Sequence, residues 1–395
     1  MYNFLCTIRD RPDLGRLVKA VFLDISDLAD ATHTNEQYSQ LVQERILSLG
    51  LLGRYAHRML ERRAGRTIRR KYETLAQVIM AQLSGIETLH LEAFETSTDI
   101  FGVFDDLAGT RDKRTPPPRP TNVLWPQLKQ CALFVPPKNR RPWPLESCKG
   151  LVSLAPQLSS FHTREFTFLQ RDVAFLENLT QLHLKCSHVL RTGCLRQALR
   201  SIRSLEVFSL IWPWDCESHT NHPLTDAVQL LKSYHKDTLR RLQLGGAFPS
   251  QSPLEAPELR QFPALEELRI HGNCIPLVRD GEAPDELPLA SILPASIRCL
   301  HIIFASSSHV PQLVSLANEF QLPHMVREHP HLREVTVMYH VRGDGDDLID
   351  DDFLDDTDDS ITNGDLNLLD SVFSQTDISF SAKALGNYDW DTEEF

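Results

Sequence analysis

The chain has 395 residues, of which 42% are hydrophobic and 24% are charged, a composition typical of a globular protein with a large core. It has no run of about 18 apolar residues that would cross a bilayer, and its first residues lack the basic end and apolar centre of a signal peptide. These features exclude the membrane-spanning and secreted classes, and we expect a cytoplasmic or nuclear protein.

The net charge of −12 is the sum of two unlike parts. From Gly343 onward, 17 acidic residues stand against a single base, Lys383, which gives that part a charge of −16. Residues 1 to 342 carry 40 bases and 36 acids, or +4. A weakly basic body is therefore joined to a strongly acidic C-terminal part.

Residues 1 to 83 are predicted to form a helical N-terminal cap with one leading strand. The strand is expected within Leu17 to Leu23, and a helical stripe from Tyr38 stops at Gly50, a residue suited to a C-cap. A basic stretch runs from Arg54 to Lys71. It is a nucleic-acid face, a solvated helical face or a face that pairs with the chain's own acidic tail. The absence of a domain-wide basic excess disfavours the nucleic-acid face.

A six-residue pattern, apolar-x-x-apolar-x-apolar, returns nine times after this cap. Its starts are 21 to 42 residues apart, which leaves room for one short strand, one return element and, in places, an inserted loop. The nine copies begin at Ile86, Leu128, Leu158, Leu179, Leu205, Leu239, Leu265, Ile297 and Leu332. The sequence therefore predicts an α/β fold, an irregular leucine-rich-repeat solenoid over residues 84 to 342 with a parallel sheet on its concave side.

The residues between the pattern positions are candidates for a binding surface. In a strand the pattern residues point inward, so the intervening residues project from the concave face. The middle projecting position is histidine in four of the nine copies, and His162 and His183 belong to successive copies. The candidate partner-binding residues are His90, His162, Gln181, His183, Lys185, Arg241, Gln243, Glu267, Arg269 and His301.

Two explanations of these histidines stay open. They line a binding face, or histidine is simply tolerated on a half-exposed strand. The binding hypothesis predicts that affinity for the partner changes between about pH 5.5 and 7.5, where an ordinary imidazole titrates.

A tryptophan pair, Trp212 and Trp214, directly follows the strand of the fifth copy. Exposed tryptophans at the end of a strand are typical of a binding hot spot. The alternative is that the pair packs under the next loop.

The sequence lacks the motifs of enzymes and metal sites. It has no G-x-x-x-x-G-K-[ST], H-E-x-x-H, G-x-S-x-G or G-x-G-x-x-G pattern. Its eight cysteines include no C-x-x-C pair, so neither a disulfide framework nor a zinc site is predicted. We therefore expect no enzymatic activity, no cofactor and no bound metal.

Residues 343 to 395 are predicted to form a disordered acidic tail. Ten aspartates between Asp344 and Asp359 repel one another and cannot form a packed core. Apolar residues are interspersed among them, so a role as an acidic-hydrophobic docking segment is the alternative.

Two segments of the chain carry a family resemblance. They are Phe4-Leu-x-x-Ile8-x-x-Arg11-Pro12-x-Leu14-x-x-Leu17-Val18-x-x-Val21-x-Leu23 and Leu83-Ser-Gly-Ile86-Glu-Thr-Leu89-His-Leu91. In these segments the chain resembles the filamentous-fungal F-box and leucine-rich-repeat-like proteins, and the resemblance extends over residues 1 to about 340. In that family an F-box docks on the adaptor of a cullin-type ubiquitin ligase, and the repeats hold the substrate.

The resemblance implies a substrate-receptor-like recognition module that lacks the F-box, because the chain begins at the segment that follows the F-box in that family. The ligase adaptor is an expected partner only if an F-box is missing from the gene model. The alternative is a stand-alone scaffold or inhibitor with no link to ubiquitin. In both cases we expect a protein partner on the repeat surface, and neither a membrane nor a nucleic acid.

Overall fold

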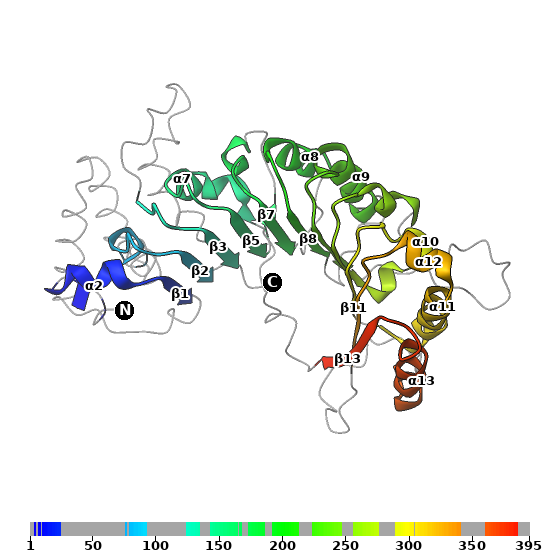
Figure 1. Ribbon diagram of the computed structural model, residues 1–395. Helices are drawn as coiled ribbons and strands as arrows, with labels where there is room; N and C mark the ends of the chain where they lie inside the picture. The colour runs from blue at the N-terminus through cyan, green and yellow to red at the C-terminus, as the bar shows by residue number, and fades with distance from the viewer. Residues whose placement is uncertain are drawn as a thin grey trace, which may run out of the picture. The chain divides into compact units, whose positions relative to one another are not determined.

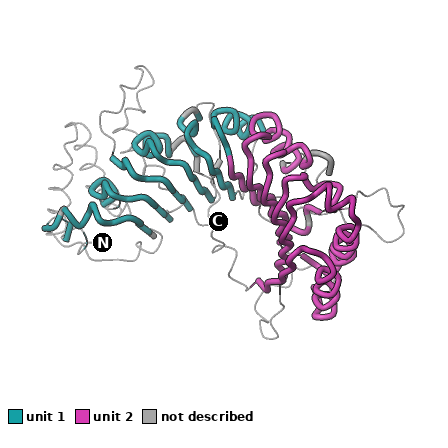
Figure 2. Tube along the Cα trace, in the orientation of Figure 1, with its two compact units in different colours: residues 1–205 teal, residues 206–395 magenta. Residues whose placement is uncertain are grey.

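The fold is described from a computed structural model of the chain (Figure 1). The residues described are 4, 7–8, 10–24, 76, 79–92, 124–134, 143–164, 166–167, 173–185, 192–212, 223–246, 256–275, 289–303, 305–340 and 360–385. They belong to two compact units, Met1–Leu205 and Glu206–Phe395, which Figure 2 shows in different colours.

The first unit is a parallel β-sheet with short helical segments between its strands. Its strands pair in the order β1 (Ala20–Asp24), β2 (Thr88–Glu92), β3 (Gln130–Phe134), β5 (Ser160–Arg164) and β7 (Gln181–Lys185). The helical segments are α2 (Pro12–Leu17), η2 (Leu145–Cys148), α7 (Lys149–Ser153), η3 (Ala174–Leu176) and α8 (Thr192–Ser201). A separate small sheet pairs β4 (Trp143–Pro144) with β6 (Phe166–Thr167).

The second unit repeats this architecture with longer helices. Its neighbouring strands are β8 (Val207–Trp212), β9 (Arg241–Gly246), β10 (Glu267–His271), β11 (Cys299–Ile303), β12 (Glu334–His340) and β13 (Ser379–Leu385), all parallel. The helical segments are α9 (Pro223–His235), η4 (Ala256–Gln261), η5 (Gly272–Cys274), α10 (Leu289–Ile292), η6 (Ser307–His309), α11 (Val310–Phe320), α12 (Pro323–Glu328) and α13 (Asn363–Phe373). In the described part of the chain, no helix is long and apolar enough to span a membrane.

The nine hexapeptides form strands, and within each unit their pattern residues stack in register. The central pattern residue of each copy lies opposite that of the next, and each of them is at most 1% exposed. These residues are Leu89, Cys131, Phe161 and Leu182 in the first unit, and Phe208, Leu242, Leu268, Leu300 and Val335 in the second. Burial of one such side chain contributes about 1.5–3 kcal/mol, so the stacked copies form the core of each unit. The predicted α/β repeat fold with a parallel sheet is confirmed.

The connecting helices lie on the side of the sheet toward which these apolar residues point (Figure 1). Helix α8 buries Leu195, Ala198 and Leu199, a spacing of three and four residues that puts all three on one helical face. Helix α11 does the same with Leu313, Leu316 and Ala317. We call the opposite face of each sheet the outer face. It carries the residues that alternate with the buried pattern positions.

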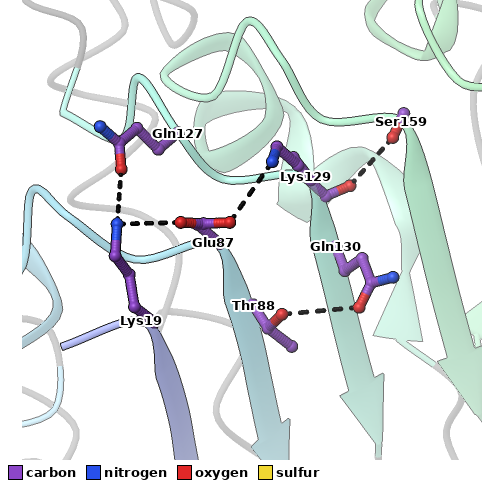
Figure 3. Close-up of polar contacts among 7 residues, drawn as sticks. All are labelled: Lys19, Glu87, Thr88, Gln127, Lys129, Gln130 and Ser159. Atoms are coloured by element: carbon purple, nitrogen blue, oxygen red, sulfur yellow. Dashed lines mark hydrogen bonds and ion pairs between the residues drawn. The ribbon is translucent and has the colours of Figure 1, made fainter.

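Polar contacts join the turns that precede successive strands of the first unit (Figure 3). Glu87 accepts from two lysines, with its Oε1 2.9 Å from Lys19 Nζ and its Oε2 3.3 Å from Lys129 Nζ. These hydrogen bonds, from Lys19 first and then Lys129, hold the pKa of the Glu87 carboxyl below its ordinary value. The backbone forms a parallel series, because Glu87 N–H donates to Lys19 O at 2.7 Å and Lys129 N–H donates to Glu87 O at 2.9 Å. The side chains thus repeat the register that the backbone sets.

The leading strand expected in the N-terminal part of the chain is present. Strand β1 begins at Ala20, inside the expected segment, and its Val21 pairs with Leu89 of β2. Helix α2 precedes it and begins at Pro12, where proline's fixed φ suits the first turn. The helix expected from Tyr38 to Gly50 and the basic stretch from Arg54 to Lys71 lie outside the described residues.

The prediction of a disordered tail over residues 343 to 395 is wrong for residues 360 to 385. Asn363–Phe373 forms α13 and Ser379–Leu385 forms β13, which pairs along its length with β12. The reason is a local core, since Leu369 and Phe373 are fully buried and the Phe373 and Phe380 rings stack with centroids 5.0 Å apart. The repeats therefore continue beyond residue 342, while the aspartate-rich residues 343 to 359 lie outside the described residues.

We expect this last repeat to depend on Phe373. Phe373→Ala should destabilise α13 and β13 by about 3–5 kcal/mol, because it removes a fully buried ring that stacks on Phe380. Hydrogen exchange of the full chain should show β13 amides losing at least 100-fold of their protection, while β9 and β10 keep theirs. Leu368→Ala, on the same helix but 47% exposed, is the matched control. Equal protection in both variants would contradict this account of the last repeat.

Candidate partner-binding surface

The outer face of the first unit consists of three rows of side chains that cross its five strands. The middle row is Phe22, His90, Ala132, His162 and His183, each opposite the next. The row at the C-terminal ends of the strands is Glu92, Phe134, Arg164 and Lys185 on β2, β3, β5 and β7. Five of the predicted binding residues belong to this unit, and the register brings His162, Gln181, His183 and Lys185 together on β5 and β7.

His162 and His183 stack on each other, with ring centroids 3.9 Å apart and planes inclined by 14°. His162 Nε2 is also 3.0 Å from Ser160 Oγ on the same strand. Burial, together with a smaller effect of the nearby His90, lowers the pKa of His162 to about 4. The expected change of affinity between pH 5.5 and 7.5 is therefore wrong for His162, which stays neutral over that range.

His90 forms part of an aromatic cluster at the other end of the same face. Its ring centroid is 5.4 Å from that of Phe22 and 4.6 Å from that of Phe134. Phe22 is 71% exposed, which is unusual for a large apolar side chain and offers contact area to a partner. The cluster joins β1, β2 and β3, so this end of the face is apolar and the end at β5 and β7 is polar.

The outer face of the second unit is a polar network in which side chains of the same or neighbouring strands contact one another. Arg269 Nε donates to Glu267 Oε1 at 2.7 Å, and His301 Nε2 lies 3.7 Å from the same oxygen. Burial lowers the pKa of His301, followed by the charge of Arg269, while Glu267 and Glu334 act in the opposite direction. Glu267 thus lies close to two basic groups, Arg269 on the same strand and His301 on the next.

Two of the predicted residues are too buried to meet a partner directly. His183 is 5% exposed and Gln243 is 4% exposed, and Ser209 Oγ donates to Gln243 Oε1 at 3.1 Å. Their neighbours one strand away cover them, because the strands are only about 4.8 Å apart. The other eight are half-buried: His90, His162, Gln181, Lys185, Arg241, Glu267, Arg269 and His301. Their role in partner binding stays a prediction.

The tryptophan pair is described only in part. Trp212 ends β8, opposite Gly246, but its side chain and the whole of Trp214 lie outside the described residues. The choice between a hot spot and a packed pair therefore stays open.

The structure adds residues that the sequence reasoning did not select. On the first unit's outer face they are Phe22, Glu92, Phe134 and Arg164, and on the second unit's they include Glu334 and Ser381. Thr336 lies on the same face but is fully buried. Thr336 Oγ1 donates to Glu334 Oε1 at 3.1 Å and is 2.9 Å from Ser381 Oγ on β13. The alternation of side chains along a strand puts Phe134 and Thr336 on this face, so that alternation is the sequence signal for them.

The described part of the chain holds no group of three His, Cys, Asp or Glu side chains that could bind a metal ion. Cys131, at a pattern position, is fully buried, and burial raises the pKa of its thiol above the ordinary value. Burial likewise raises the pKa of Cys274 to about 12. Cys131 and Cys274 therefore act as small apolar core residues.

Comparisons with known proteins add little to this description. No protein-family model matches the chain, and no curated protein matches its sequence. Among solved structures, the chain is similar to the one described as the crystal structure of the Rad7 and Elc1 complex in yeast. The identity is 11% and the TM-score 0.26, over 85% of this chain and 90% of that chain. A likeness at this score carries no argument about family or function.

We expect His162 to make the protein sensitive to acid. Its pKa is lower in the folded chain than the ordinary 6.5, so the unfolded chain takes up the proton first, and stability falls as the pH drops from 6.5 toward 4. Between pH 7 and pH 4.5, His162→Gln should therefore lose about 2–3 kcal/mol less stability than the parent chain.

Denaturant unfolding of the full chain at both pH values measures this difference. The same substitution at His324, which is exposed on α12, is the matched control. An equal loss of stability in the parent chain and in His162→Gln would show that this imidazole is not held neutral.

Proposed function

We propose that the chain is a protein-recognition module that holds its partner on the outer faces of its repeat sheets, and that it has no enzymatic activity of its own. The observation that supports this most is the variety of that surface. The helices cover one face of each sheet, and the opposite face presents charged, polar and aromatic side chains at its in-register positions. Such a surface supplies shape and specific polar contacts without a reactive centre.

Within this class, we favour a substrate receptor of the ubiquitin-ligase kind. The resemblance of the Phe4–Leu23 and Leu83–Leu91 segments to fungal F-box and leucine-rich-repeat-like proteins supports this choice. In such a receptor the repeats bind the protein to be modified, and a separate segment binds the ligase adaptor. The adaptor is a partner of this chain only if an F-box precedes the present sequence.

The second candidate is a scaffold or inhibitor that binds a protein partner with no link to ubiquitin. The contacts of Glu267 with Arg269 and His301 on the second unit support it. A surface whose side chains are held by one another is preorganised and suits long-lived binding to one partner. The two candidates differ in what happens to the partner after binding.

A photo-crosslinking experiment tests the common part of the proposal. A photoreactive amino acid at Gln181 or Arg269, on the outer faces, should crosslink the full chain to a protein in extracts of its source cells. The same group at Arg196, exposed on the helix side of the first unit, is the matched control. We expect the outer-face positions to give at least tenfold more of the crosslinked product than Arg196, and equal yields would contradict the proposal.

The identified partner then separates the two candidates. A substrate should gain abundance and lose ubiquitin when the gene for this chain is deleted, because its receptor is gone. The partner of a scaffold or inhibitor should keep both its abundance and its ubiquitin content.

A further inference from the structure

The C-terminal row of the first unit's outer face changes charge from one end to the other. Along β2, β3, β5 and β7 the row reads Glu92, Phe134, Arg164 and Lys185, and each residue lies opposite the next. All four side chains are half-buried. An acidic end and a doubly basic end are therefore separated by an aromatic ring.

The charges of this row are segregated rather than alternating. Strands β3, β5 and β7 include no acidic residue, and β2 includes no basic one apart from His90. Glu92, Arg164 and Lys185 each take part in other interactions as well. A partner would therefore be recognised by the order of charges along the row, rather than by an unsatisfied hydrogen-bonding group.

The second unit shows the opposite arrangement, which argues that the segregation is specific to the first. There Glu267 lies beside Arg269 on the same strand, at 2.7 Å, and 3.7 Å from His301 on the next. Opposite charges at this spacing cancel one another a short distance above the surface. The order of charge along the strands therefore differs between the two units.

The centre of the row offers apolar contact. The Phe134 ring is 4.6 Å from the ring of His90, which also contacts the largely exposed Phe22. Burial lowers the pKa of His162, in the neighbouring middle row, so that residue adds no positive charge at neutral pH. An apolar side chain can thus be buried between the two charged ends.

We propose that this row binds an extended segment of a partner protein in which a basic and an acidic residue flank an apolar one. The basic residue lies over Glu92, the apolar residue against Phe134, and the acidic residue over Arg164 and Lys185. Strands are about 4.8 Å apart, so Glu92 and Lys185 are about 14 Å apart across three steps. An extended chain covers that distance in about four residues. This inference rests on the proposed role in protein recognition and specifies the chemistry of the partner.

Three synthetic peptides of equal length test the inference by fluorescence anisotropy with the full chain at about 50 mM salt. The first carries Lys and Glu four residues apart around a Leu, the second carries Glu at both positions, and the third carries Lys at both. The bipolar peptide should bind at least fivefold more tightly than either other, which is about 1 kcal/mol per misplaced charge. The preference should fade at about 0.5 M salt, where screening is short-ranged.

The most informative variant changes which peptide the chain prefers. Glu92→Lys makes all three charged positions of the row from β2 to β7, at 92, 164 and 185, positive, so the preference should change from the bipolar peptide to the doubly acidic one. Glu206→Lys makes the same charge change in the exposed turn before β8 and should leave the bipolar preference unchanged. Retention of the bipolar preference by Glu92→Lys, or a change of preference in Glu206→Lys, would overturn the inference.

Two other outcomes are equally decisive. If the three peptides bind equally, or if none binds at up to about 1 mM, the row does not read charge order, while crosslinking at Gln181 still tests partner recognition separately. If the bipolar preference emerges only after the aspartates between Asp344 and Asp359 are replaced by Asn, the chain's own acidic segment is the occupant. That result would show that the row reads charge order only when the acidic segment is altered, and it would overturn binding of an external segment by the unaltered chain.

Discussion

The structure depends on one constraint, the in-register stacking of the buried pattern side chains of successive repeats. A single hexapeptide cannot bury Leu89 or Leu242 by itself, and it does so only when the equivalent residues of its neighbours lie directly opposite. Parallel pairing sets this register, and the backbone series through Lys19, Glu87 and Lys129 continues it into the turns. Because a slip of one residue would turn the whole buried row toward solvent, the register is strongly specified.

The same stacking determines what the outer face can offer. Side chains one strand apart touch, and neighbours therefore decide the chemistry of each residue. His162 and His183 show this most clearly, since their stacked rings bury each other and keep His162 neutral down to about pH 4. Gln243 shows it in another way, because its amide oxygen accepts from Ser209 beneath the surface. A residue that projects from a strand is therefore not necessarily accessible.

The two units use this rule differently. In the second unit, Glu267 and Arg269 alternate in charge at short distance and form a self-contained network. In the first, acidic and basic residues are collected at opposite ends of a row with Phe134 between them. The paired charges of the second unit favour rigidity of its surface, and the segregated charges of the first unit favour discrimination among charged partners. Recognition by charge order would give a repeat surface specificity without a pocket.

The sequence by itself determined the repeats, since the nine hexapeptides lie at strands and Leu17–Leu23 overlaps the leading strand. It did not reveal β13, because the exposed Asp377 stands where the pattern demands an apolar residue, and because the local core comes from Phe373 on a helix outside the pattern. The sequence also placed His162 beside His183. It did not reveal the burial of these two residues, nor the charge order of the row that contains Glu92 and Lys185. The periodicity of a strand is a local property that a sequence displays directly. Burial and pairing depend on residues tens of positions away, so only the tertiary structure decided them.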